Sequence, residues 1–213
     1  MPMKWDVFKA KTEKFLLLNK EIVSSLENKK FSAKANIGYW LKTGKIISLK
    51  RGIYLVKERY EKETNKEMFL EYISNSLLKP SYLSLEYVMA KYALLSEPVF
   101  AFTSVTTATT RVIKNELSNF RYYSVTPELF TGYKIKYFLG APIWEATKEK
   151  AVFDYIYSRF LKNYAINERI VNELRINWGE VNKVEWRKIK AYGQLCRSTK
   201  VKKAIALIEK MYF

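Results

Sequence analysis

The side chains that most enzymes use for catalysis are scarce in this sequence. Its 213 residues include no histidine and a single cysteine, Cys196, which excludes the usual zinc and haem ligand sets and every nucleophile paired with histidine. An enzyme built from this chain would depend on carboxylate, lysine or tyrosine side chains. We therefore expect no catalytic residue, no metal and no cofactor.

One short segment nevertheless has the residue types of an active site. Glu149, Lys150 and Asp154 follow one another closely. The segment also has the pattern of a helix that begins near Thr147, with an acid at the positive end of the helix dipole and a lysine four residues before an aspartate. We interpret these side chains as structural, because a paired-carboxylate or two-metal centre would need acids from elsewhere in the chain.

Basic side chains, which bind phosphate, are abundant and unevenly distributed. The 38 lysines and arginines exceed the 21 acids and give a net charge of +17. Residues 1–57 carry +9, residues 58–146 carry zero and residues 147–213 carry +8. This segregation indicates that particular surfaces meet a polyanion such as nucleic acid.

The apolar stretches are much shorter than the roughly 20 residues that a membrane span needs. The first residues lack the apolar core and cleavage site of a secretory signal. We expect a cytoplasmic protein with no membrane partner.

Helical periodicity predicts three helices near the N-terminus. The first runs from Asp6 to about Leu18, and the second, Lys20 to Glu27, is capped by Asn19. The third runs from Ser32, its N-cap, to Thr43 and is ended by Gly44 in the left-handed conformation. The second and third form a helix-turn-helix.

A short β-hairpin is predicted directly after these helices. Two β-prone runs between Lys45 and Val56 flank a turn in which Gly52 supplies a positive φ. A hairpin after a helix-turn-helix is the wing of a winged helix-turn-helix. We therefore predict that residues 1–57 are a DNA-binding domain of this class.

The third helix is the predicted recognition helix, because the major groove admits one α-helix and exposes the base edges there. Ile37, Trp40, Leu41 and Ala33 share the side expected to face the core. Lysines around the helix and the hairpin tip are assigned to phosphates, and Ala35, Asn36 and Tyr39 to bases. The candidate DNA-binding residues are Lys29, Lys30, Ser32, Lys34, Ala35, Asn36, Tyr39, Lys42, Lys50 and Arg51.

Residues 58–213 are expected to form an α+β domain. A helix from about Asn65 to Leu78 is ended by Pro80, and a further helix opens at Ser81 with Ser84 as a cap. Residues 99–144 are rich in β-branched and aromatic side chains and predict one antiparallel sheet. The predicted strands are Val99 to Val105, Thr109 to Lys114, Phe120 to Thr126 and Tyr133 to Phe138. Residues 147–213 predict a basic helical tail.

Several blocks of residues, in order over about residues 18–160, resemble the AbiEi-type antitoxins, the transcriptional regulators of abortive-infection AbiE toxin-antitoxin systems. The blocks are Gly44-Lys45-Ile46, Lys50-Arg51-Gly52-Ile53-Tyr54, Ser81-Tyr82-Leu83-Ser84-Leu85-Glu86, Phe120-Arg121-Tyr122-Tyr123-Ser124-Val125, Glu128-Leu129-Phe130-Thr131-Gly132, and Ala146-Thr147-Lys148-Glu149-Lys150-Ala151 closing on Asp154. Tyr123 stands where the family often has histidine, so no role of that side chain transfers.

The resemblance implies a type IV antitoxin. Its winged helix would bind repeats in the promoter of its own operon and repress transcription. Its C-terminal domain would neutralise a nucleotidyltransferase toxin without a stable complex. An operator with two half-sites would place two protomers on the DNA.

Two other functions stay open. One is a DNA-binding accessory protein without a toxin partner. The other is a nucleic-acid-processing enzyme that uses the winged helix for targeting, which would require clustered acids where residues 58–146 offer scattered glutamates. An adjacent nucleotidyltransferase gene would distinguish the antitoxin from both.

Overall fold

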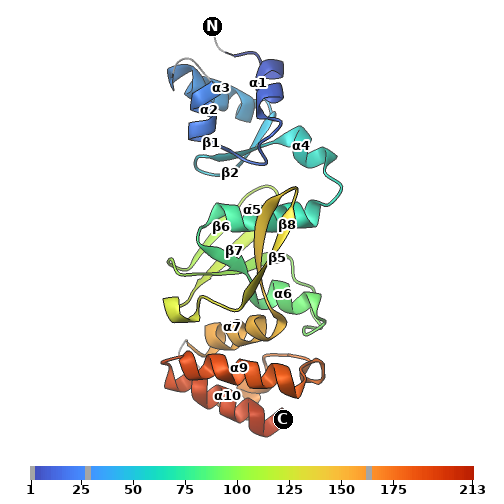
Figure 1. Ribbon diagram of the computed structural model, residues 1–213, viewed down its shortest axis with the longest axis vertical. Coiled ribbons are helices and arrows are strands. Elements are labelled where there is room, and N and C mark those ends of the chain that lie inside the picture. Colours follow the sequence, from blue (N-terminus) through green and yellow to red (C-terminus); the bar gives the residue numbers. More distant parts are fainter. Residues whose placement is uncertain (1–2, 27–29, 162–164) are drawn as a thin grey trace. The chain divides into compact units, whose positions relative to one another are not determined.

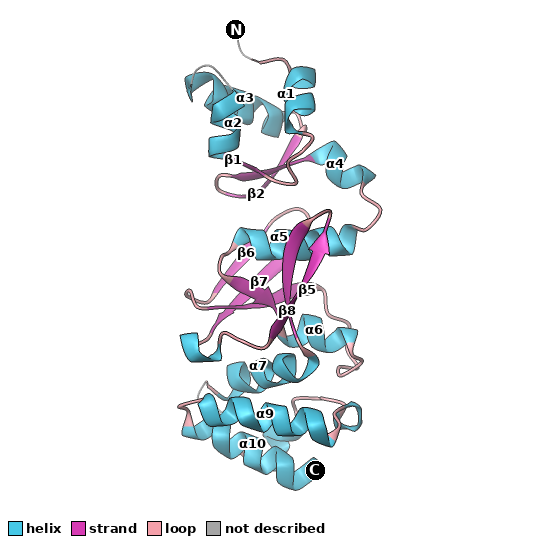
Figure 2. Cartoon of the chain, in the orientation of Figure 1, coloured by secondary structure: helices cyan, strands magenta, loops and turns pink. Residues whose placement is uncertain are grey.

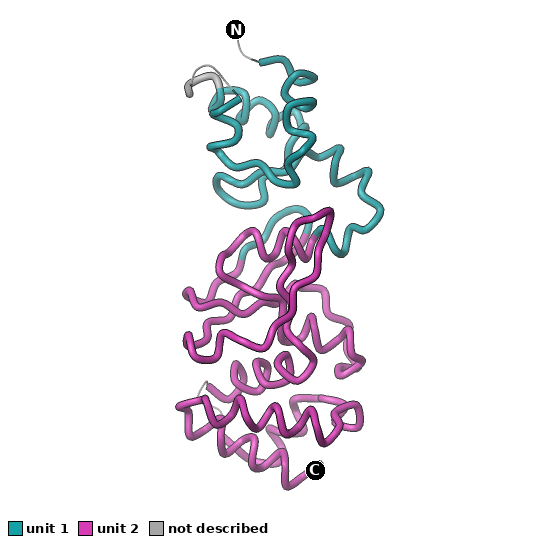
Figure 3. Tube along the Cα trace, in the orientation of Figure 1, with its two compact units in different colours: residues 1–69, 113–117 teal, residues 70–112, 118–213 magenta. Residues whose placement is uncertain are grey.

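The computed structural model describes residues 3–26, 30–161 and 165–213, with backbone only for residues 30–32. The chain forms two compact units (Figure 3). Unit 1 comprises residues 1–69 and 113–117, and unit 2 comprises residues 70–112 and 118–213. The first unit thus extends beyond the expected boundary at residue 57 and includes a distant segment.

Unit 1 combines helices with a three-stranded sheet. Its helices are α1 (Trp5–Thr12), α2 (Lys20–Leu26), α3 (Lys30–Lys42) and α4 (Lys57–Lys62), and α5 (Lys66–Leu77) begins in this unit. Its strands are β1 (Leu18–Asn19), β2 (Ile46–Lys50) and β3 (Ile53–Val56), paired antiparallel in the order β1-β3-β2. The chain order α1-β1-α2-α3-β2-β3 can be followed in Figure 1.

The two signals that separate these elements act as predicted. Asn19 accepts a hydrogen bond from the Ile22 N–H (2.7 Å) and so caps α2. Gly44 has a φ of 66°, which lets the Lys45 N–H bond to the Trp40 carbonyl (2.8 Å) and close α3 in a Schellman motif. The predicted hairpin is also present, with Gly52 at a φ of 86°.

Two helix predictions in unit 1 are wrong in their bounds. The first helix ends at Thr12 instead of Leu18, because Leu18 pairs with Tyr54 and becomes part of the sheet. Helix α3 begins at Lys30, so Ser32 lies inside the helix and is not its N-cap.

Unit 2 is built around a six-stranded sheet with helices packed on it (Figure 2). Its strands are β4 (Ser81–Leu83), β5 (Ala101–Thr106), β6 (Arg111–Lys114), which ends in unit 1, β7 (Asn119–Ser124), β8 (Tyr133–Phe138) and β9 (Ala141–Ala146). The strand order is β6-β7-β5-β4-β9-β8. The predicted mixture of helix and strand in this part of the chain is confirmed.

The helical tail predicted for residues 147–213 is present and is divided into several helices. The helices of unit 2 are α6 (Leu85–Lys91), α7 (Lys148–Phe160), α8 (Glu168–Asn172), α9 (Lys183–Leu195) and α10 (Thr199–Tyr212), with 3-10 turns at Pro127–Leu129 and Trp178–Glu180. Asn182 and Glu185 form a capping box at the start of α9. In the described part of the chain, no helix has the length and apolar character needed to cross a membrane.

The sheet differs from its prediction in direction and extent. Strands β5 and β7 run parallel, as do β4 and β9, so the sheet is mixed and not antiparallel. Strands β5 and β7 are neighbours in the sheet although β6, at the edge beyond β7, separates them in the chain. Two strands were missed: Ser81–Leu83 pairs with β5 instead of opening a helix, and β9 completes a hairpin with β8.

A buried charged pair on α7 is hydrogen-bonded to Tyr82 of β4 and to Ser84, the residue before α6. Lys150 and Asp154 are both fully buried and form the ion pair that their spacing of four residues predicts. The Asp154 carboxylate also accepts hydrogen bonds from Ser84 Oγ (2.7 Å) and the Tyr82 hydroxyl (3.0 Å). The Lys150 ammonium lies 5.2–5.4 Å from the ring centres of Tyr82, Phe153 and Tyr192.

Removal of one partner of this pair should be strongly destabilising. Asp154→Ala leaves a buried ammonium without its counter-charge, so we expect the free energy of unfolding to fall by about 3–5 kcal/mol in urea titrations. The double variant Lys150→Met with Asp154→Asn removes both charges and keeps an acceptor for the Tyr82 and Ser84 hydroxyls. It should lose less than Asp154→Ala, and an equal loss would contradict this account of the pair.

Candidate nucleic-acid interface

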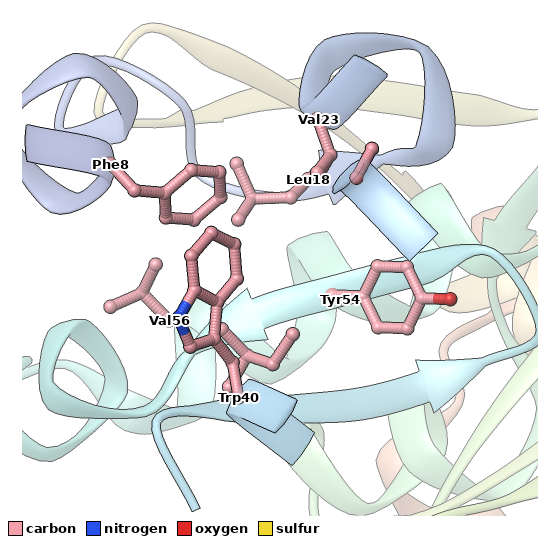
Figure 4. Close-up of a cluster of buried hydrophobic side chains, with 8 residues drawn as sticks. Phe8, Leu18, Val23, Trp40, Tyr54 and Val56 are labelled. Atoms are coloured by element: carbon pink, nitrogen blue, oxygen red, sulfur yellow. The ribbon is translucent and has the colours of Figure 1, made fainter. Parts of the chain in front are cut away.

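The orientation of α3 is set by Trp40 in the core of unit 1. Trp40 is buried, and its ring centre lies 4.1 Å from that of Phe8 and 5.4 Å from that of Trp5. Figure 4 shows Trp40, Phe8 and Val56 directed toward one another, with Leu18 nearby. Ala33 is also buried and Ile37 partly so, which confirms the predicted inward side of the helix.

The opposite side of α3 is exposed. Its exposed residues are Lys34, Ala35, Gly38, Tyr39 and Lys42. At 100° per residue they occupy one continuous face. Tyr39 is 58% exposed. This face can present a tyrosine and two ammonium groups to a partner.

Not every candidate residue lies on this face. Asn36 is only 7% exposed, so the predicted base contact of its side chain is wrong for this structure: its position in the helix turns it toward the body of unit 1. Lys29 lies outside the described residues, and the side chains of Lys30 and Ser32 do as well.

The β2–β3 hairpin supplies the other candidates. Arg51 is exposed in the two-residue turn, and Lys50, at the end of β2, is partly exposed. The pairing shifts register between Ser48 and Lys50, which is a bulge that twists the end of the hairpin. The guanidinium of Arg51 is therefore held at the tip of a short, bent ribbon.

The elements that carry these residues contain no acid. Between Glu27 and Glu58 the sequence has no aspartate or glutamate, whereas it has eight lysines and arginines. The run covers all of α3 and the hairpin. This acid-free run is a sharper sequence signal than the net charge of residues 1–57, and it was missed.

Acids of unit 1 gather instead at α1 and α4. Asp6, Glu13, Glu58 and Glu63 line one hollow there, together with Lys9, Arg59 and Lys62. Glu58 bonds to Lys62 (2.7 Å) and Lys9 (2.5 Å), and these hydrogen bonds lower the pKa of Glu58 to about 2. In this hollow Glu58 is paired with Lys9 and Lys62, whereas the α3 face has lysines and no acid.

Gly38 of α3 is a further feature of this face that was not predicted from the sequence. It occupies the middle of the exposed face, and a Cβ added there would meet no atom within 4 Å. Glycine inside a helix weakens the helix. Because a side chain at this position would meet open space, packing within unit 1 does not require glycine here. A bare patch of helix backbone is suited to close approach by a ligand.

Two buried glutamates of unit 2 come together with two lysines. Glu71 of α5 and Glu145 of β9 both bond to Lys136 (2.6 and 2.7 Å) and to Lys91. The Tyr87 hydroxyl also donates to Glu71 (2.7 Å). The sequence suggested that the glutamates of residues 58–146 are scattered, but these two lie together in the fold. The lysines occupy the positions that cations would take, and the described residues contain no group of three or more acids or cysteines able to hold a metal.

No model of a known protein family matches the chain, and no curated protein matches it at a significant level.

Opposite effects on stability are expected for two positions of α3. Gly38→Ala should raise the free energy of unfolding by about 0.5–1 kcal/mol, because alanine favours the helix and its methyl group meets open space. Trp40→Ala should lower it by about 3–5 kcal/mol, because it empties the core beside Phe8. Chemical denaturation monitored by circular dichroism checks both. Destabilisation by Gly38→Ala would show that the exposed face is packed.

Proposed function

We propose that the protein is a sequence-specific repressor that binds double-stranded DNA in its own promoter and acts as the antitoxin of a type IV toxin-antitoxin system. The observation that carries the DNA-binding part is the exposed, acid-free face of α3, which the basic β2–β3 hairpin follows in the chain. Lys34 and Lys42 would contact phosphates, and Ala35 and Tyr39 would face base edges.

The arrangement of unit 1 supports a winged helix-turn-helix. In this motif a short strand between the first two helices pairs with the hairpin that follows the recognition helix. Strand β1 pairs with β3 of the hairpin in this way. In that frame α3 is the recognition helix, β2–β3 is the wing, and Lys50 and Arg51 at its tip contact an adjacent phosphate or the minor groove.

Gly38 fits the same function. A helix that enters the major groove approaches the bases most closely along the middle of its exposed face. A residue without a side chain at this place lets the backbone approach, while Ala35 and Tyr39 farther round the same face remain available for contacts. The stability lost by a glycine within α3 then has a functional reason.

The antitoxin part is supported by the resemblance to AbiEi-type antitoxins and by how its residue blocks pack. Tyr82 and Ser84 come from one block, and Lys150 and Asp154 from another, yet they share one buried hydrogen-bonded cluster. Gly132, from a third block, leaves room for the Tyr192 hydroxyl and for Lys150, where a Cβ would overlap both. Unit 2 would neutralise a nucleotidyltransferase toxin.

Specific DNA binding is the first test. We expect the full chain to bind its upstream region more tightly than unrelated DNA at about 0.15 M salt, because base contacts add to the salt-dependent phosphate contacts. Lys50→Ala with Arg51→Ala should weaken binding to all sequences and reduce the salt slope by up to about 2 units, since each phosphate contact contributes about 0.9. Fluorescence anisotropy over a salt series measures both.

The matched control is Lys62→Ala with Lys66→Ala, which removes the same charge from exposed residues outside the face and the hairpin. Equal effects of the two double variants would refute the wing contact. Gly38→Leu adds bulk to the face without filling a packed site, and should abolish specific binding while the fold is kept. Equal affinity for promoter and unrelated DNA would refute the repressor.

The antitoxin activity needs a separate test. Co-expression with a nucleotidyltransferase encoded next to the gene should restore growth that the nucleotidyltransferase alone inhibits. Gly38→Leu should keep this rescue although it loses DNA binding, because the residue belongs to unit 1. If growth is not rescued while promoter binding is intact, the protein is a DNA-binding regulator without a toxin partner.

A further inference from the structure

Unit 2 contains a cavity of about 600 Å³ that no part of the proposed function uses. This volume is in the range of small-molecule sites. Its floor is formed by β5 and β7, with Thr103 and Arg121 among the lining residues, and its walls include Glu86 of α6 and Arg159 of α7. The segment 95–100 forms part of its rim and includes Phe100.

Most charges around the cavity are already paired. Arg175 bonds to Glu97, and Glu173 bonds to Arg169 (3.1 Å). Glu86 and Arg159 form a looser ion pair with each other, at 3.8 Å. Arg159 is held by Tyr155, whose hydroxyl lies 3.1 Å from Nη2 and whose ring centre lies 5.0 Å from the guanidinium carbon. Arg121 lies beside Tyr123 and forms no salt bridge to any described residue.

Glu86 has an unsatisfied oxygen. Its Oε1 lies 3.8 Å from Arg159, too far for a hydrogen bond. Its Oε2 is shielded from solvent and has no hydrogen-bond partner within the described residues. Glu86 lines the cavity and its side chain is 23% exposed, so a ligand in the cavity can donate a hydrogen bond to this carboxylate.

Phe100 adds an apolar surface at the rim. It is 82% exposed, the largest exposure among the large hydrophobic side chains of the described chain. An aromatic ring on the surface of a polar cavity is a platform on which a planar ring can stack.

We propose that this cavity binds a ribonucleotide. The phosphate pairs with Arg121 and Arg159, the ribose hydroxyls donate to Glu86, and the base stacks on Phe100. Each contact has a common physical precedent: arginine forks bind phosphate, a carboxylate accepts from a ribose 2′-hydroxyl, and aromatic rings stack on bases of any identity. The pattern selects ribose over deoxyribose and leaves the base unselected.

Isothermal titration of the full chain with adenosine monophosphate tests the site. We expect one molecule to bind per chain, with 2′-deoxyadenosine monophosphate and ribose 5-phosphate each bound about tenfold more weakly, because one hydrogen bond to a charged group or one stacked base is lost. Equal affinity for the ribose and deoxyribose forms, or for inorganic phosphate, overturns the assignment. So does the absence of binding at millimolar nucleotide.

Variants locate the site on the protein. Arg121→Ala and Phe100→Ala remove exposed side chains, so their folds should be unaffected. Each should weaken binding of adenosine monophosphate about tenfold or more. Glu86→Gln should reduce the preference for ribose over deoxyribose, which a purely structural role of Glu86 would not change.

Arg187→Ala is the control for general attraction of phosphate to a basic protein. Arg187 is exposed on α9 and does not line the cavity. It should bind the nucleotide with unchanged affinity. A loss equal to that of Arg121→Ala would mean that the binding is nonspecific and would overturn the site. Promoter binding by the cavity variants should be unchanged, which separates this outcome from the proposed repressor function.

Discussion

The packing of Trp40 against Phe8 determines what unit 1 can present to a partner. A helix has one orientation once a large side chain on it is buried, because every other side chain then follows at 100° intervals. With Trp40 inside, the positions of Tyr39 and Gly38 are outside. The composition of the exposed face is thus a consequence of a contact on the opposite side of the helix.

Unit 2 depends on neutralised charges in its interior. Lys150 and Asp154 are buried together, and the buried Glu71 and Glu145 are neutralised by Lys91 and Lys136, which reach them from the surface. Buried ions are tolerated when geometry and further hydrogen bonds offset their desolvation. Tyr82, Ser84 and Tyr87 supply such bonds. Glu86 is a contrast, because one of its oxygens lacks this support.

Elements that depend on residues close together in the sequence could be predicted, and elements that depend on distant pairings could not. Caps and turns depend on neighbouring residues, so Asn19, Gly44 and the hairpin could be predicted. Ser81–Leu83 could not, because it becomes a strand only by pairing with β5, and neither could the parallel direction of β7. Of the candidate site, the outward positions of Ala35, Tyr39 and Lys42 followed from periodicity. The burial of Asn36 and the cavity of unit 2 depend on the tertiary fold and could not be predicted.

The segment 113–117 has a consequence for how the chain can be divided. It belongs to unit 1, although residues 70–112 before it belong to unit 2. Its Asn115 side chain donates a hydrogen bond to the carbonyl of buried Leu49 (3.1 Å), on β2. A fragment that ends at residue 57 or 69 lacks this donor, so simple truncation does not yield a complete unit 1. A faithful minimal fragment would have to carry the segment across on an engineered linker, as a chimera rather than a deletion.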